Sequence, residues 1–260
     1  MIPSLLRRQK NRRSGIMTQL NGRVAIVTGA TKGIGRAIAE SLVDAGVSVC
    51  VSARTQADVT RVAAALAARR PGGTRPAAAG VACDVRDAVS CEGLVAATVQ
   101  QLGRLDILIN NAGIGAFAPL AEMTIETWDA VIQTNLNSLF YCTHAAMPHL
   151  RAAGDAWVIN IGSLAGKNAF PNGTAYNASK FGLIGFSEAL MQEVRYDGIR
   201  VAYIMPGSVA TEFMGRTPGP QDDWRIQPED VARAVLDVLT FPSRSLPSRI
   251  ELRPSRPPRK

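Results

Sequence analysis

The sequence predicts one doubly wound α/β domain, in which a parallel sheet of seven strands is covered by helices on both faces. Two patterns predict this class. Short runs rich in β-branched residues alternate with longer stretches of helical periodicity, and this alternation favours right-handed strand–helix–strand crossovers. Several of the short runs are also continuously apolar, which is typical of parallel strands buried on both faces.

The predicted strands are the short apolar runs. The first reads RVAIVT and the second VSVCVS, and both carry the β-branched residues that strands favour. We expect the seven strands at residues 23–28, 47–52, 80–83, 105–110, 157–161, 200–204 and 248–252.

The stretches between these runs have helical patterning. The last one begins with Pro228, followed by Glu229 and Asp230, and all three residues suit the first turn of a helix. Residues 69–76 are rich in glycine, proline and arginine and predict a surface loop. We expect the helices at residues 35–45, 56–69, 88–102, 125–151, 174–196 and 228–240.

Composition excludes several classes of protein. With 260 residues, 47% hydrophobic and 19% charged, the chain can bury a substantial core and is not of a disordered type. Its four cysteines form no C-x-x-C pair, and His144 and His149 have no plausible metal partner, so we expect no disulfide framework and no metal. No apolar run reaches the roughly 18–20 residues of a membrane helix.

The net charge of +8 is unevenly distributed. Residues 1–16 carry +5 and residues 249–260 carry +4, which leaves −1 for residues 17–248. The surplus that could suggest nucleic-acid binding therefore lies at the two ends, and no basic helix face marks the rest. We expect neither a nucleic-acid nor a membrane partner.

The two ends are predicted to lie outside the domain of residues 17–252. Residues 1–16 are read as a disordered extension upstream of Met17, and residues 253–260 as a basic, proline-rich tail. An organellar transit peptide is the alternative for the first segment. Arginine makes up 24 of the 29 basic residues throughout the chain, so its abundance there does not single out a signal. We expect a cytoplasmic location.

A glycine turn follows the first predicted strand and reads TGATKGIG over residues 28–35. A strand, a glycine turn and a helix place backbone N–H groups and a positive helix end where a pyrophosphate can bind. The second strand ends at Ala53 and Arg54, without the acid that would hold the ribose 2′-hydroxyl of NAD. Arg54 and Lys32 are therefore predicted to bind the 2′-phosphate of NADP(H), the alternative being that both are solvated surface cations.

Four polar residues suggest chemistry. Tyr176 and Lys180 are four residues apart and share one helix face. Ser163 follows a predicted strand at its carboxyl end, where open parallel sheets bind ligands. Asn135 lies within the long helical stretch 125–151. Taken singly, such a pair is more often part of an exposed helix face, and such an asparagine is more often solvated.

Together these segments resemble the short-chain dehydrogenase/reductase family over about residues 17–252. The family's T-G-x-x-x-G-x-G is at residues 28–35, its N-N-A-G at 110–113, its Y-x-x-x-K at 176–180 and its P-G turn at 206–207. The resemblance implies a Rossmann-type fold. One departure is Gly162, at a position where many members have a second serine.

The resemblance assigns roles to the four polar residues. Tyr176 would be the general acid/base, and Lys180 would lower its pKa and bind the nicotinamide ribose. Ser163 would hydrogen-bond the substrate oxygen, and Asn135 would hold a water that links Lys180 to solvent. The expected cofactor-binding residues are Gly29, Thr31, Lys32, Gly33, Ile34, Arg54, Asp84, Val85, Asn111, Ala112, Gly113, Tyr176, Lys180, Pro206, Gly207, Val209 and Thr211.

The implied activity is NADP(H)-dependent reduction of a carbonyl or oxidation of a secondary alcohol, similar to reductases of 3-oxoacyl thioesters. Polyol, sugar or steroid dehydrogenases of the same family, and a non-catalytic NADP(H)-binding regulator, are the alternatives. A homodimer or homotetramer through the helices 125–151 and 174–196 is expected from the resemblance. Residues 212–227 are expected to form a substrate lid over an open pocket. Candidate pocket residues, each of which could equally belong to the core, are Phe117, Leu164, Phe170, Met205 and Met214.

Overall fold

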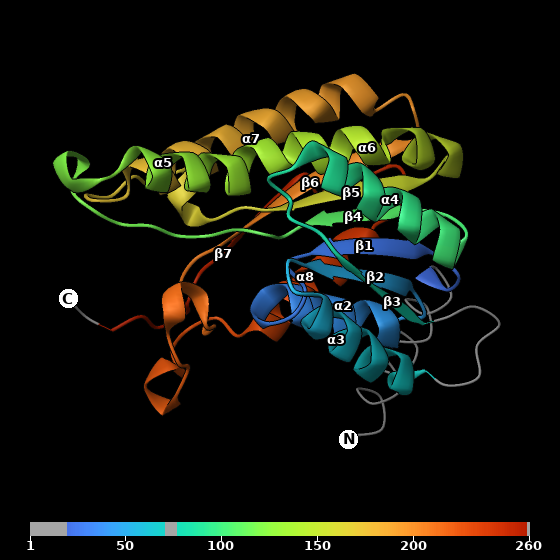
Figure 1. Cartoon of the computed structure of the whole chain (residues 1–260), viewed down its shortest axis with the longest axis horizontal. Coiled ribbons are helices and arrows are strands. Elements are labelled where there is room, and N and C mark those ends of the chain that lie inside the picture. Colours follow the sequence, from blue (N-terminus) through green and yellow to red (C-terminus); the bar gives the residue numbers. More distant parts are fainter. Residues whose placement is uncertain (1–19, 71–76, 259–260) are drawn as a thin grey trace, which may run out of the picture.

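A computed structural model describes residues 20–70 and 77–258 of the chain (Figure 1), and the predicted extension 1–16 lies outside them. In the described part, seven parallel strands form one sheet in the order β3-β2-β1-β4-β5-β6-β7. The predicted doubly wound α/β fold is therefore confirmed. The strands are β1 (Val24–Thr28), β2 (Ser48–Ala53), β3 (Ala78–Ala82), β4 (Ile107–Asn110), β5 (Ala156–Ile161), β6 (Ile199–Pro206) and β7 (Arg249–Leu252).

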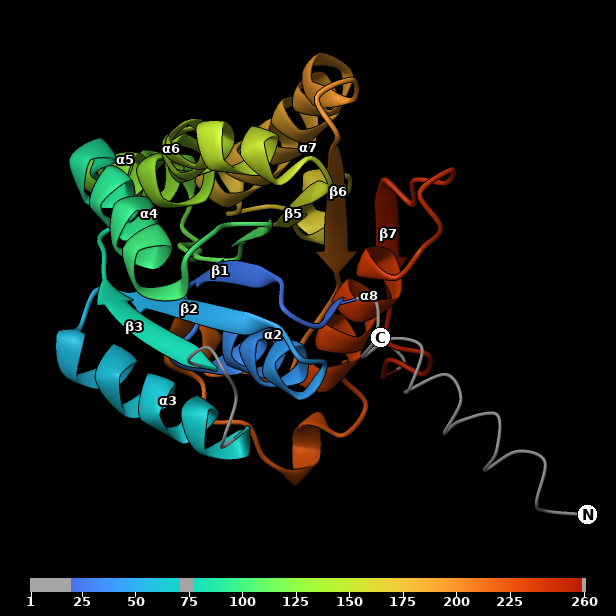
Figure 2. The same ribbon diagram turned by 90° about the vertical axis from the view of Figure 1, so that its right-hand side faces the viewer.

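Helices cover both faces of this sheet, as Figure 2 shows with α4 to α7 on one side and α2, α3 and α8 on the other. Along β1, Ala25 and Val27 face the cluster formed with α2, α3 and α8, whereas Val24 and Ile26 face the cluster formed with α4, α6 and α7. Both faces are thus buried, which explains why the strand sequences are apolar throughout. The helices are α2 (Gly33–Asp44), α3 (Gln56–Arg69), α4 (Ala88–Leu102), α5 (Ile125–Ile132), α6 (Ser138–Ala153), α7 (Thr174–Val194) and α8 (Pro228–Leu239).

The predicted single helix over residues 125–151 is wrong in one respect. It is divided into α5 and α6 by a π-helical turn at Gln133–Asn137. The Asn135 side chain in this turn accepts a hydrogen bond from the N–H of Ile114 (2.8 Å) and donates one to its carbonyl (2.9 Å). Insertion of one residue into the helix rotates Asn135 toward the loop after β4, and π turns of this kind are frequent at functional sites.

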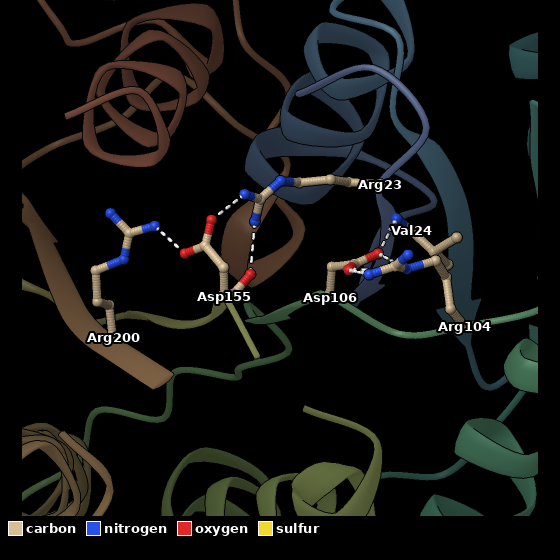
Figure 3. A network of polar contacts seen from close by, with 6 residues as sticks. All are labelled: Arg23, Val24, Arg104, Asp106, Asp155 and Arg200. Carbon is tan, nitrogen blue, oxygen red and sulfur yellow. Dashed lines mark hydrogen bonds and ion pairs between the residues drawn. The ribbon is translucent and has the colours of Figure 1, made fainter. Parts of the chain in front are cut away.

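The amino ends of the strands are held by charged side chains (Figure 3). Asp106, just before β4, accepts a hydrogen bond from the N–H of Val24 (2.8 Å) and forms an ion pair with Arg104. Asp155, just before β5, forms ion pairs with Arg23, just before β1, and with Arg200 on β6. Arg23 also donates to the Asp155 carbonyl (2.7 Å). These contacts, which we name the amino-edge network, tie together strands that are far apart in the sequence.

Candidate active site

The glycine turn lies at the opposite, carboxyl edge of the sheet, between β1 and α2. Gly29 has a φ of 63°, and a Cβ there would lie 2.9 Å from the Cα of Ala112. A Cβ on Gly35 would lie 2.4 Å from the side-chain nitrogen of Asn111 and from the carbonyl oxygen of Gly29. Both positions therefore require glycine, and the turn is packed directly against the loop that follows β4.

Thr28 joins this turn to the N-N-A-G segment. Its hydroxyl accepts hydrogen bonds from the backbone N–H groups of Asn111 and Ala112, both at 3.0 Å. The Asn111 side chain donates in return to the carbonyls of Thr28 (2.9 Å) and Gly29 (3.1 Å). Two segments predicted to contact the cofactor, about 80 residues apart in the sequence, are thereby fixed side by side.

The amino end of α2 fits a dinucleotide pyrophosphate. Lys32 is the N-cap residue and makes no side-chain capping hydrogen bond, and the first turn contains no acid. The first N–H groups of the helix thus have no side-chain cap, and they point where a phosphate would lie. A carboxylate oxygen of Glu212 lies 3.7 Å from the position of a Cβ on Gly33, so an anionic group is already accommodated beside this positive end.

The remaining cofactor candidates of the amino half line the ends of β1, β2 and β3. Lys32 and Arg54 are exposed, and neither forms an ion pair with any residue that the structure describes. Asp84 is bound by Arg86 through two guanidinium nitrogens, and this hydrogen-bonded pair, with further help from the charge of Arg54, lowers the pKa of Asp84. Thr31 is partly exposed in the turn, whereas Ile34 and Val85 pack into the core clusters.

The predicted catalytic residues converge at the carboxyl ends of β4 and β5. Tyr176 and Lys180 both lie on α7, and the Lys180 ammonium is 5.8 Å from the centre of the Tyr176 ring. Ser163 follows β5, and its hydroxyl acts to lower the pKa of Tyr176. Lys180 is only 5% exposed and donates a hydrogen bond to the carbonyl of Ile161 (3.1 Å). It forms no ion pair among the described residues.

Burial dominates the electrostatics of this pair. It raises the pKa of Tyr176, although the Ser163 hydroxyl acts in the opposite direction. It lowers the pKa of Lys180 to about 8, since the charged ammonium is cut off from water. The expectation that Lys180 lowers the pKa of Tyr176 stays a prediction, because the net shift seen in the chain alone is set by burial. Tyr176 is protonated at neutral pH, in the form that can donate a proton.

Residues 23–221 match the short chain dehydrogenase family. The chain belongs to this family. A protein of Streptomyces virginiae, assigned as a ketoacyl reductase of monensin polyketide synthase, is 43% identical over 202 residues, which are 77% of this chain and 76% of that protein. The D-threitol dehydrogenase of Mycolicibacterium smegmatis is 37% identical over 79% of this chain and 77% of its own length.

Two solved structures have the same fold. A metagenomic short-chain oxidoreductase in complex with NADP superposes with a TM-score of 0.79 at 35% identity, covering 92% of this chain and 100% of its own. The 3-ketoacyl-(acyl-carrier-protein) reductase of Brucella melitensis, in complex with NADH, superposes with a TM-score of 0.78 at 27% identity over 89% of this chain and 97% of its own. The fold and family are therefore those of an NAD(P)-dependent short-chain oxidoreductase.

Asn135, the fourth predicted catalytic residue of this short-chain dehydrogenase, is committed to protein contacts. Besides its two bonds to Ile114, its side chain donates to the hydroxyl of Ser179 (3.1 Å), which donates to the carbonyl of Tyr176 (2.8 Å). Asn135 and Lys180 both border Gly113, with Oδ1 and Nζ lying 3.3 and 3.8 Å from the position of a Cβ there. Asn135 thus positions the loop after β4 against α7, and its relay role stays a prediction.

The segment after β6 closes the site from the other side. Pro206 is the last residue of β6, and the Gly207 N–H donates to the carbonyl of Leu252 (2.9 Å). Val209 forms a parallel bridge with Ile226, and the Thr211 methyl lies 3.3 Å from the position of a Cβ on Gly33. The P-G segment therefore does return to the glycine turn, as the prediction of a pyrophosphate contact requires.

Of the candidate pocket residues, Met205 belongs to the core, which was the alternative for each of them, and two residues near Tyr176 were missed. Met205 is fully buried and packs with Leu139, Leu183 and Tyr203, so it does not line an open pocket. Phe213 was missed, although its ring lies 6.0 Å from that of Tyr176. Asn177 was also missed. It fixes the loop after β5 by donating to the carbonyl of Ala165 (2.6 Å), and its position beside Tyr176 in the Y-x-x-x-K segment was the available signal.

The described residues contain neither a candidate membrane span nor a candidate metal site. No helix there is long and apolar enough to cross a membrane. No group of three or more histidine, cysteine or acidic residues in that part of the chain could hold a metal ion.

Proposed function

We propose that this chain is an NADP(H)-dependent oxidoreductase that reduces a carbonyl group, or oxidises the corresponding secondary alcohol, with Tyr176 as general acid/base. One observation carries the proposal: Tyr176, Lys180 and Ser163 lie together at the carboxyl edge of the sheet, and the N-N-A-G loop next to Lys180 packs against the glycine turn before α2. A nucleotide site and a proton donor are thus adjacent, which is the arrangement that hydride transfer coupled to proton transfer needs.

Tyr176, Ser163 and Lys180 have different roles in the proposed reaction. When bound, a reduced nicotinamide supplies a hydride, that is one hydrogen with two electrons, to the carbonyl carbon. Tyr176 donates the proton that the carbonyl oxygen then requires, so the product is the alcohol. Ser163 hydrogen-bonds that oxygen and stabilises its developing negative charge. Lys180 adds positive potential next to the phenol, and this favours the phenolate that is left after proton transfer.

The preference for NADP(H) is supported by two cations at the end of β2 and in the glycine turn. Arg54 and Lys32 are exposed and free of ion pairs in the described part of the chain, so both are available to a 2′-phosphate. No carboxylate ends β2, where one would repel that phosphate. The metagenomic neighbour was solved with NADP, and the Brucella melitensis reductase with NADH.

Replacement of these cations tests the cofactor preference. We expect Arg54→Ala and Lys32→Ala each to lower kcat/KM for NADPH by about 10-fold and to leave kcat/KM for NADH nearly unchanged, because only the 2′-phosphate loses a charge-assisted hydrogen bond. Arg61→Ala is the matched control, since Arg61 is also an exposed cation and pairs with Asp58 on α3. Equal use of NADH and NADPH by the unaltered protein would contradict the preference.

The activity itself is tested by NADPH oxidation with a panel of carbonyl compounds: a 3-oxoacyl thioester, a simple ketone, a ketosteroid, a sugar ketone and an aromatic aldehyde. We expect turnover with at least one of them and its loss in Tyr176→Phe. NADPH binding without turnover of any panel member or of the matching alcohols would instead favour a non-catalytic regulator.

We also propose a homodimer or homotetramer formed through α5, α6 and α7. Large apolar side chains are exposed on these helices, and a second copy would cover them. Sedimentation equilibrium, which measures the mass of the assembly, tests this oligomeric state. A cytoplasmic location remains a prediction. The exposed side chains are Ile125 (74%), Trp128 (36%), Phe140 (53%) and Phe181 (47%).

A further inference from the structure

Four large apolar side chains are exposed near Tyr176: two lie against its ring, and the other two lie next to them. We name this group the apolar rim; it consists of Phe117, Phe170, Phe213 and Met214. Phe117 comes from the loop after β4, Phe170 from the loop after β5, and the other two from the segment after β6. All three segments leave the carboxyl edge of the sheet. The exposed fractions are 43%, 39%, 37% and 50% in the order given.

The rim is continuous with the proposed proton donor. The Phe117 ring packs edge-to-face against both Phe170 (5.3 Å between ring centres) and Tyr176 (5.5 Å). Phe213 approaches the Tyr176 ring from another segment, at 6.0 Å. A molecule whose carbonyl oxygen reaches Tyr176 and Ser163 must therefore place its neighbouring substituent against these rings.

Two glycines make room for the rim. A Cβ on Gly115 would lie 2.7 Å from a ring carbon of Phe213 and 3.0 Å from the sulfur of Met214. A Cβ on Gly173 would lie 2.5 Å from a ring carbon of Phe170. Each ring thus lies directly on a backbone that has no side chain at that point, and the loops cannot be rearranged without losing this contact.

The loops that carry the rim are held in place. Ala118 donates a backbone hydrogen bond to the carbonyl of Asn172 (2.9 Å), which joins the loop of Phe117 to that of Phe170. Asn177 accepts one from the N–H of Phe170 (3.3 Å). Met214 has a φ of 60°, a left-handed conformation that is unfavourable for a methionine. A strained residue held against Gly115 indicates a surface shaped before a ligand arrives.

Lys167 and Arg216, which are cations of the loops after β5 and β6, form ion pairs with Glu251 and Asp222. The Lys167 ammonium lies 3.0 Å from Glu251 on β7, and the carboxylate of Glu212 lies beside Gly33 in the glycine turn. Recognition of a polyol requires a hydrogen-bonding partner for each hydroxyl group, whereas exposed rings gain free energy when an apolar group covers them. The rim therefore favours an apolar substituent on the substrate.

We propose that the apolar rim is the substrate-specificity surface, and that the substrate is a ketone or secondary alcohol carrying an aryl or similarly large apolar ring close to the reacting carbon. This inference rests on the proposed function and narrows it. A substrate of this kind differs from the small polyols that a polyol dehydrogenase oxidises.

The test compares three ketones with NADPH: 4-phenyl-2-butanone, 2-butanone and 1,3-dihydroxyacetone. The first two differ only by the phenyl ring. We expect kcat/KM for the phenyl ketone to exceed that for 2-butanone by at least about 30-fold, which equals about 2 kcal/mol and is the size expected for burying such a ring. Dihydroxyacetone is expected to be the poorest substrate.

Rim variants locate the effect. Phe117→Ala and Phe213→Ala should each reduce the ratio of the first two kcat/KM values by about 10-fold. Phe213→Leu, which keeps apolar bulk without the ring, should give an intermediate ratio, and it serves if the alanine variant fails to fold. Phe241→Ala is the matched control, because Phe241 is a phenylalanine of similar exposure (45%) that follows α8, and it should leave the ratio unchanged.

Failure of this inference and failure of the proposed function would give different results. Preference for 1,3-dihydroxyacetone, with turnover that is lost in Tyr176→Phe, would overturn this inference and leave the proposed function intact. Absence of Tyr176-dependent turnover with any carbonyl compound or alcohol would overturn the proposed function itself. Rim variants that change the sedimentation coefficient and not the ratio would show that a second copy covers the rim, and would overturn the inference as well.

Discussion

The two edges of the sheet differ in whether their buried charges have a counter-ion. At the amino edge, Asp106 is 1% exposed, and its carboxylate both pairs with Arg104 and accepts the N–H of Val24 (Figure 3). At the carboxyl edge, Lys180 is 5% exposed and has only the neutral carbonyl of Ile161 as its hydrogen-bond acceptor in the described residues. One edge neutralises its charges, and the other keeps a cation without a counter-ion.

This difference separates a structural role from a chemical one. A buried ion that has a partner of opposite charge destabilises the fold less than an unpaired one. It also fixes the relative positions of the strands that it joins. A buried cation without a partner destabilises the fold, and groups of this kind with a shifted pKa concentrate at functional sites. We therefore expect changes at the amino edge to alter stability alone. Changes at the carboxyl edge should remove activity without loss of stability.

The largest effect is expected from Lys180→Met, which keeps the side-chain volume and removes the charge. Turnover should fall by at least about 100-fold, because Tyr176 loses the neighbouring positive potential. The free energy of unfolding at pH 7 should rise, by roughly 3 kcal/mol at most, because the pKa of Lys180 is about 8 in the folded chain and 10.5 in a free lysine. Chemical denaturation and NADPH turnover measure the two effects.

The difference in unfolding free energy between Lys180→Met and wild type should depend on pH. Below pH 8 the folded wild-type protein carries the full cost of charging Lys180. Between about pH 8 and 10.5 the unfolded chain binds more protons than the folded one, so wild-type stability rises relative to the variant and the difference disappears. Lys167→Met is the control, since Lys167 is exposed and paired. A variant less stable than wild type at pH 7 would show that the cation is structural.

A smaller and opposite effect is expected from Asp106→Ala. It leaves the Val24 N–H and the Arg104 guanidinium without their partner, and the N–H is buried. We expect a loss of about 1–3 kcal/mol of unfolding free energy and an unchanged kcat/KM. Asp58→Ala, which removes an exposed ion pair with Arg61, should cost less. A fall in kcat/KM at constant stability would mean that the two edges are not independent.

The smallest effect is expected from Asp155→Ala. Burial pushes the pKa of Asp155 upward, but Arg23 and Arg200 outweigh it and hold the pKa below its usual value. Its side chain is nevertheless 53% exposed, so the loss should be under about 1 kcal/mol at pH 7. Because a lowered pKa stabilises only the ionised form, the difference should vanish as the pH falls through the folded pKa, and 0.5 M salt should reduce it. A difference that persists at pH 2 would point to packing instead.

The fold could be predicted from the sequence because its strands are apolar on both faces. The predicted boundaries of β1, β2 and β5 fall within one residue of the observed ones. β3 starts two residues earlier than predicted, since its first residues are alanines, which are poor strand formers. The motif residues could be placed in order along the chain, and the structure brings Tyr176, Lys180 and Ser163 together as that order implies.

What could not be predicted depends on contacts between distant segments. The π turn at Asn135 exists because of the backbone of Ile114, across a loop. Whether Met205 lies in the pocket or in the core could not be decided, because a strand buried on both faces gives no sign of which side chains reach an opening. Phe213 was missed, because its ring is placed by Gly115 in a distant loop. The raised pKa of Tyr176 results from burial, which a spacing of four residues does not reveal.

The most direct test of the account is the turnover of Tyr176→Phe, measured with NADPH and a ketone that the unaltered protein reduces. The account predicts a fall in kcat of at least about 100-fold. KM for NADPH and the melting temperature should stay close to those of the unaltered protein, because only a proton-donating hydroxyl is removed. Retention of most of the turnover would contradict the claim that the carboxyl edge, with Tyr176 beside an unpaired Lys180, is the catalytic centre.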